Sequence, residues 1–108
     1  MATKPIESVT SACALLDELA RNFEPRRMAE IATDLKAAGQ TWGTTKLYEQ
    51  LQTLVQVGYV DATPDGRYFL GAAFTRAAAA YVRHLNERAE HLRRQVADIT
   101  TSLERESL

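Results

Sequence analysis

The sequence has a single cysteine, Cys13, and therefore cannot form an intrachain disulfide. Cys13 lies among small apolar residues with no histidine beside it, so we expect a buried structural thiol rather than a reactive group. Long apolar runs are also missing, because no stretch approaches the roughly 20 residues of a membrane helix. The first ten residues contain no apolar core of a signal peptide. We therefore expect a cytoplasmic protein that does not bind a membrane.

The patterns of an enzyme are missing as well. The sequence has no glycine-rich phosphate loop, and no nucleophile is paired with a base. The two histidines, His84 and His91, are two helical turns apart, which is too far for one shared metal ion. Asp17 and Glu18 are adjacent, so we expect them to face solvent on different sides of a helix rather than form an acid–base pair. We predict no catalytic residues, no metal site and no cofactor.

A strong positive charge is also absent. The 108 residues carry 13 Lys and Arg against 14 Asp and Glu, which gives a net charge of −1. Residues 1–71 contain 7 basic and 9 acidic side chains, whereas residues 72–108 contain 6 and 5. Many nucleic-acid-binding domains are clearly basic, so non-specific attraction to phosphate should be weak. Any binding to nucleic acid would need a locally basic face.

The first 40 residues contain two amphipathic helical stretches. The first follows Ser8 or Thr10, either of which can cap it, and the pattern is broken between Arg21 and Pro25. The second runs around residues 27–38 and ends at Gly39 and Gln40. We expect the second helix to bury four apolar residues, Met28, Ile31, Ala32 and Leu35.

The stretch from Thr41 to Gly71 organises the rest of the chain. It contains a helix whose apolar residues share one face, with Thr41 or Thr44 as its N-cap and Gly58 ending it. Pro64-Asp65-Gly66 then separates two short apolar segments, which is typical of a tight hairpin. The order helix–helix–helix–strand–strand predicts a mainly α winged helix-turn-helix with a β-hairpin wing. The apolar face consists of Leu47, Leu51, Leu54 and Val55.

A winged helix-turn-helix usually presents its third helix to the major groove of DNA. Thr and Lys suit phosphate oxygens and base edges, Tyr can stack, and Gln can pair with adenine. A wing arginine can enter the minor groove, and two arginines at the start of the second helix can meet phosphate. Trp42 is interpreted either as a core wedge between the second and third helices or as an exposed contact. The candidate DNA-binding residues are Thr44, Thr45, Lys46, Tyr48, Gln52, Arg67, Arg26 and Arg27.

These residues resemble the DNA-binding half of IclR-type transcriptional regulators over roughly residues 8–71. The most specific part is Gly58-Tyr59-Val60 followed by Pro64-Asp65-Gly66-Arg67-Tyr68-x-Leu70-Gly71. Ser8-Val9 with Leu15-Leu16, and Ala29-Glu30-Ile31-Ala32, resemble the family's first and second helices. The connection at 36–43 is longer than the family's Gly-x-Pro turn, and Thr44-Thr45-Lys46 lacks the usual preceding basic residue. The 108 residues hold no counterpart of the family's effector domain, so we expect no small-molecule effector.

Residues 72–108 contain neither glycine nor proline, which predicts one long helix. Apolar residues recur with heptad spacing over four heptads, which is typical of a coiled coil. A helix this long exceeds what the preceding domain can cover, so we expect a homodimer, with the two helices parallel. Position d is occupied by Ala78, Leu85, Leu92 and Ile99, and position a by Val82, Ala89, Val96 and Leu103.

The sequence therefore predicts a flexible arm at 1–7, a winged helix-turn-helix at 8–71 and a dimerisation helix at 72–108. The predicted function is a homodimeric, sequence-specific DNA-binding transcriptional regulator whose partners are double-stranded DNA and a second copy of the chain. In the alternative, the acidic balance and Glu49 on the exposed helix indicate a winged-helix protein-interaction module that does not bind DNA.

Overall fold

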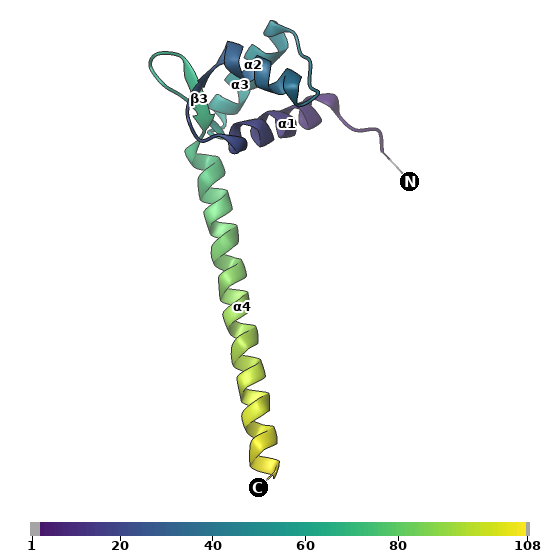
Figure 1. The fold of residues 1–108 in the computed structure, drawn as a ribbon, viewed down its shortest axis with the longest axis vertical. Helices are drawn as coiled ribbons and strands as arrows, with labels where there is room; N and C mark the ends of the chain where they lie inside the picture. Colours follow the sequence, from purple (N-terminus) through teal and green to yellow (C-terminus); the bar gives the residue numbers. More distant parts are fainter. Residues whose placement is uncertain (1–2, 108) are drawn as a thin grey trace. The chain divides into compact units, whose positions relative to one another are not determined.

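The computed structural model describes residues 3–107, which form a mainly helical fold with a small antiparallel sheet (Figure 1). The predicted architecture, a winged helix followed by a long helix, is confirmed. Residues 1, 2 and 108 lie outside the described part, so the predicted arm is described only from Thr3 onward. The elements are α1 (Glu7–Arg21), β1 (Arg26–Arg27), α2 (Met28–Ala37), α3 (Thr44–Gln56), β2 (Val60–Ala62), β3 (Arg67–Leu70) and α4 (Ala72–Ser107).

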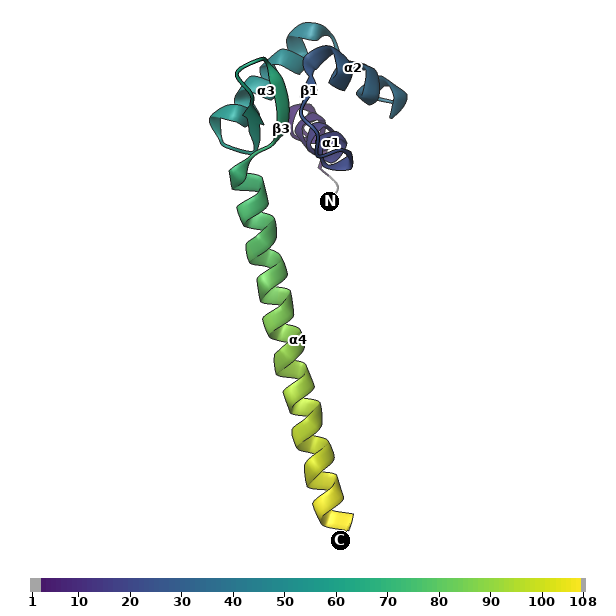
Figure 2. The same cartoon turned by 60° about the vertical axis from the view of Figure 1, so that its left-hand side comes forward.

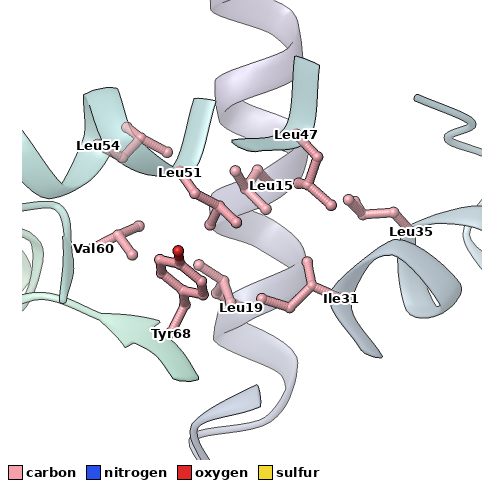
Figure 3. Packing of buried hydrophobic residues seen from close by; sticks show 9 residues of the cluster. All are labelled: Leu15, Leu19, Ile31, Leu35, Leu47, Leu51, Leu54, Val60 and Tyr68. Atoms are coloured by element: carbon pink, nitrogen blue, oxygen red, sulfur yellow. The ribbon is translucent and has the colours of Figure 1, made fainter. Parts of the chain in front are cut away.

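The core of the winged unit is formed by side chains from three helices and two strands, which point toward one another in Figure 3. The predicted inward face of α3 is confirmed, with Val55 packed at the margin of the core. The prediction for α2 is partly wrong, because Ala32 is exposed and Met28 only half-buried. The buried cluster consists of Leu15, Leu19, Ile31, Leu35, Leu47, Leu51, Leu54, Val60 and Tyr68.

The C-terminus of α3 is fixed by Gly58, as predicted. Gly58 has a φ of 83°, a left-handed conformation that is accessible to glycine at little cost. The amide of Tyr59 donates to the Leu54 carbonyl at 3.0 Å and that of Gly58 to Val55 at 3.1 Å, which is a Schellman motif. The polypeptide returns close to this point, since a Cβ on Gly71 would lie 2.3 Å from the Gly58 carbonyl oxygen. Glycines at both positions thus allow α3 and the start of α4 to meet.

The predicted N-caps are wrong. Helix α1 begins at Glu7, so Ser8 and Thr10 lie inside the helix, and Ile6 takes the cap position two residues before Ser8. Thr44 is the first residue of α3, and Gly43 precedes it in an extended conformation. Neither Ile nor Gly has a side-chain oxygen, so these two helix starts are set by tertiary packing rather than by a local cap.

The sheet contains a strand that the sequence did not predict. Arg26 and Arg27, expected to begin the second helix, form β1 and pair antiparallel with β3, as the adjacent ribbons in Figure 2 show. The strand order is β1-β3-β2, so β3 lies in the centre. Arg26 is opposite Tyr68 and Arg27 is opposite Arg67. The predicted hairpin is confirmed, with β2 and β3 joined by the Thr63–Gly66 turn.

Cys13 is exposed, which contradicts the prediction of a buried thiol. The buried side of α1 includes Ser11, Leu15 and Leu19. Cys13 is two residues beyond Ser11, a rotation of about 200° that places it on the opposite side of the helix. There it lines an open groove of about 420 Å³ between α1 and α3.

The chain divides into two compact units, Met1–Thr75 and Arg76–Leu108. Helix α4 begins in the first unit, where the Ala73 amide donates to the Gly58 carbonyl at 3.0 Å and the rings of Tyr59 and Phe74 meet edge to face at 6.2 Å. The helix then continues through the second unit without a break, as predicted. Within the part of the chain that the structure describes, we find no helix with the length and apolar content needed to cross a membrane.

Candidate nucleic-acid interface

The outward face of α3 is polar and exposed over its first two turns. Because Leu47, Leu51 and Leu54 hold the opposite face in the core, Thr45 and Tyr48 point away from it. Thr44 is also exposed, and the Tyr48 side chain is 52% accessible. Glu49 is exposed on the same face and introduces a negative charge among these groups.

Lys46 points toward α1 rather than along this face. Its Nζ lies 2.9 Å from Oε1 of Glu7 and 5.0 Å from the centre of the Trp42 ring. The hydrogen bond from Lys46, together with its charge, lowers the pKa of the Glu7 carboxyl. Trp42 is half-buried against the core, in agreement with its interpretation as a wedge. Lys46 therefore joins the start of α3 to the start of α1 through an ion pair, and to the preceding loop through a cation–π contact with Trp42.

Gln52 is half-buried at the junction of α3 and the wing. Its Nε2 donates to the Tyr68 hydroxyl at 3.2 Å, and Tyr68 itself belongs to the core. The sequence placed Gln52 with the base-contacting residues, whereas the structure uses its amide to hold α3 against β3.

The wing brings Arg27 and Arg67 together, because β1 and β3 pair at these positions. Arg67 Nε lies 3.1 Å from Oδ2 of Asp65, and Arg67 Nη1 lies 3.7 Å from Oε1 of Glu30. Arg27 Nη1 donates to the Asp65 carbonyl oxygen at 3.1 Å. Hydrogen bonds from the Thr63 hydroxyl and from Arg67 lower the pKa of the Asp65 carboxyl. Two arginines and two carboxylates thus share a half-exposed cluster at the wing.

Arg26 is not available to a ligand, so its prediction as a phosphate contact is corrected. The residue is only 6% exposed, and its Nη1 lies 3.0 Å from Glu18 Oε2 and 2.5 Å from Asp34 Oδ2. Its Nη2 also donates to the Glu18 carbonyl oxygen at 2.7 Å. Burial lowers the Arg26 pKa, but hydrogen bonds to Asp34 and Glu18 outweigh this effect and raise it.

Glu18, expected on the surface, is 6% exposed as the partner of Arg26. Glu18, Arg26 and Asp34 come from α1, β1 and α2, so this triad joins three elements of the winged unit. In the sequence, these three residues share only an even spacing of eight positions. That spacing matches no helix or strand period, so it does not predict their contact.

The charges on this side of the molecule do not form an uninterrupted positive stripe. Each of the remaining predicted cations, Lys46, Arg27 and Arg67, lies within 4.0 Å of a carboxylate oxygen. These pairs are partly exposed, and exposed pairs contribute only about 0–1 kcal/mol, so a phosphate group can compete with the carboxylates.

Residues 3–107 bring together no group of three or more His, Cys, Asp or Glu side chains suited to a metal ion. His84 Nδ1 lies 3.7 Å from Glu87 Oε2 on the exposed surface of α4.

Neither a family model nor a characterised protein matches the sequence. Among solved structures, the fold is similar to HmgR of Pseudomonas aeruginosa, with a TM-score of 0.60 and 20% sequence identity. The match covers 69% of this chain and 29% of the HmgR chain, so this chain spans under a third of that protein. At this identity the similarity shows the fold alone, which is a winged helix followed by a long helix.

Proposed function

We propose that the protein is a sequence-specific DNA-binding transcriptional regulator that acts as a homodimer. The observation that carries the proposal is the uncovered polar face of α3, held outward by a winged-helix fold similar to that of HmgR, an IclR-family regulator. In this proposal residues 8–71 bind DNA and residues 72–108 form the dimer.

The start of α3 enters the major groove. Thr44, Thr45 and Tyr48 are the groups best exposed for contact with base edges and phosphates, and Lys46 joins them after exchanging Glu7 for a phosphate oxygen. Gln52 contributes by holding α3 against the wing, with its amide oxygen left as an acceptor.

The wing lies along the flanking minor groove. Arg67 and Arg27 project from neighbouring strands, so both guanidinium groups can follow the phosphate backbone or enter a narrow minor groove. Asp65 and Glu30 reduce the local positive charge, which makes the binding weaker per domain and favours the use of two copies.

The second copy is bound through the apolar seam of α4. Leu92, at a d position of the heptad, is 52% exposed, and Val96, at an a position, is 64% exposed. The full proposed seam is Ala78, Val82, Leu85, Ala89, Leu92, Val96, Ile99 and Leu103.

One observation favours a second function, a winged-helix module that binds another protein. Glu49 lies on the exposed face of α3, and the nearby cations are paired with carboxylates. A neutral, mixed surface of this kind is more typical of protein interfaces than of DNA interfaces.

Replacing Tyr48 with alanine tests the proposed face of α3. We expect Tyr48→Ala to weaken binding to a selected duplex by about 5- to 160-fold, since one base contact contributes about 1–3 kcal/mol. Gln56→Ala is the matched control, because Gln56 is exposed at the other end of the same helix. Fluorescence anisotropy with the full chain measures both. Equal affinities for the two variants would remove α3 from the interface and favour the protein-interaction module.

A further inference from the structure

The seam of α4 contains information about the orientation of the proposed dimer. In the unit Arg76–Leu108, Val82, Leu85 and Ile99 are each about half exposed or more, so an apolar stripe remains at the surface of the single chain. A second copy is the occupant argued for here, and this inference therefore rests on the dimer of the proposed function.

The seam residues on the two sides of the helix midpoint are complementary in size. When two copies are aligned head to tail with Ala89 opposite Leu92, every a residue meets a d residue of the other chain. Each small residue then meets a large one, so that successive layers have similar volumes. The facing pairs are Ala89 with Leu92, Leu85 with Val96, Val82 with Ile99 and Ala78 with Leu103.

In a parallel pair each residue would instead face its own copy. The Ala89 layer would then hold two methyl groups between two layers of leucine, leaving that layer poorly filled. Val82 and Val96 at a positions and Leu85 and Leu92 at d positions do suit a parallel dimer, but Ile99 at a d position departs from that pattern. Packing thus favours the antiparallel arrangement at the layers of Ala78, Ala89 and Ile99.

The charges beside the seam point the same way. In a parallel pair, Arg88 at position g faces Arg93 at position e of the partner, so two like charges meet on each side. In the head-to-tail arrangement Arg88 faces Gln95, and Arg93 faces Asn86. Each guanidinium then meets a neutral amide oxygen that can accept its hydrogen bonds. Arg93 already has an intrahelical partner in Glu90, at 2.7 Å, which this arrangement leaves in place.

We propose that two copies of the chain associate through α4 in antiparallel orientation, with Ala89 packed against Leu92 of the second copy. This differs from the parallel pair expected from the heptads alone. In the antiparallel pair the two Ala72 residues lie about 55 Å apart along the helix axis, at a rise of about 1.5 Å per residue. The two copies of α4 then begin at opposite ends of the helix pair.

Engineered cysteines test the orientation directly. All variants carry Cys13→Ser, so that the exposed native thiol does not react. The single variant Val82→Cys should form no disulfide dimer on mild oxidation, because the two thiols lie about 26 Å apart in the antiparallel pair. The double variant Val82→Cys with Ile99→Cys should form one readily, since residue 82 faces residue 99. Non-reducing gel electrophoresis measures both products.

Two outcomes overturn the inference, and they are distinguishable. A Val82→Cys variant that cross-links as efficiently as the double variant shows a parallel pair, which refutes the orientation but keeps the proposed dimer. Light scattering on the Cys13→Ser chain provides the second readout. A monomer at all concentrations would refute both the orientation and the dimer of the proposed function, whereas DNA binding by α3 would be judged separately by Tyr48→Ala.

Discussion

At the residue scale, the ion pair between Arg26 and Glu18 is buried, whereas the ion pairs at the candidate interface are partly exposed. Arg26 is held by Glu18 and Asp34, and the Glu18 and Arg26 side chains are each only 7% exposed. A buried ion pair of this kind contributes less to net stability than to fixing how α1, β1 and α2 meet. Removing one partner, however, leaves the other charge buried without compensation.

Glu18→Ala is therefore expected to lower the free energy of unfolding by about 3 kcal/mol, because breaking a buried pair typically costs about 3–5 kcal/mol. Urea denaturation followed by circular dichroism measures the change. Asp17→Ala, at the neighbouring exposed position, is the control and should stay within about 0.5 kcal/mol of wild type. Similar stabilities for both variants would show that the triad is not formed in solution.

Glu7 provides a residue-scale test of Lys46. Glu7→Gln removes the carboxylate that holds Lys46 and also removes a negative charge near the start of α3. If Lys46 meets phosphate, duplex affinity should rise in Glu7→Gln, because the exposed Glu7 carboxylate no longer competes with the phosphate for Lys46. Asp17→Asn, with the same charge change on the same helix, controls for net charge. An equal rise in both variants would indicate a general charge effect instead.

The sequence predicted the apolar residues of the fold better than it predicted its charged residues. Leu47, Leu51 and Leu54 share a face by local periodicity, which depends only on the helix itself. Arg26 and Glu18 find each other only after three elements have packed, and neither has a local pattern that reports this. For the same reason the partners of Lys46 and Gln52 were not predicted, because each lies more than one element away in the sequence.

At the element scale, the wing depends on β1, a two-residue strand without any periodicity to predict it. Its pairing with β3 places Arg27 next to Arg67, which the sequence had assigned to separate parts of the interface. The hairpin itself was predictable, since Pro64-Asp65-Gly66 specifies a turn locally and Gly66 adopts a φ of 83°.

Arg27→Ala combined with Arg67→Ala should reduce duplex affinity similarly for all sequences. The slope of log affinity against log salt concentration should become shallower by about 2, one for each lost phosphate contact. The control is Arg94→Ala with Arg105→Ala, which removes the same charge from exposed positions of α4. Salt titrations monitored by anisotropy give the slopes. An unchanged slope in the wing variant would exclude both arginines from phosphate contact.

Leu92→Asp tests α4 as the dimerising element. A charge at a central d position would be buried in the seam without a partner, so we expect a monomer by sedimentation equilibrium. His91→Asp introduces the same charge at the adjacent position c, outside the seam, and should leave a dimer. Persistence of the dimer in Leu92→Asp would contradict the heptad assignment.

At the scale of the whole molecule, the two parts of the chain differ in net charge. Residues 1–71 carry a net charge of −2, and residues 72–108 carry +1. A winged unit of this charge attracts DNA weakly at long range, so specific contacts from α3 and the presence of two copies have to supply the affinity. In the proposed function, DNA binding therefore depends on recognition of the base sequence rather than on general attraction to phosphate.

Selection of the 108-residue chain against a pool of randomised duplexes is the sharpest test of that recognition. The account predicts that successive rounds at moderate salt enrich a recurring half-site, and that Tyr48→Ala weakens its enrichment while Gln56→Ala does not. A chain that is folded by circular dichroism but enriches no sequence above the starting pool would contradict the account.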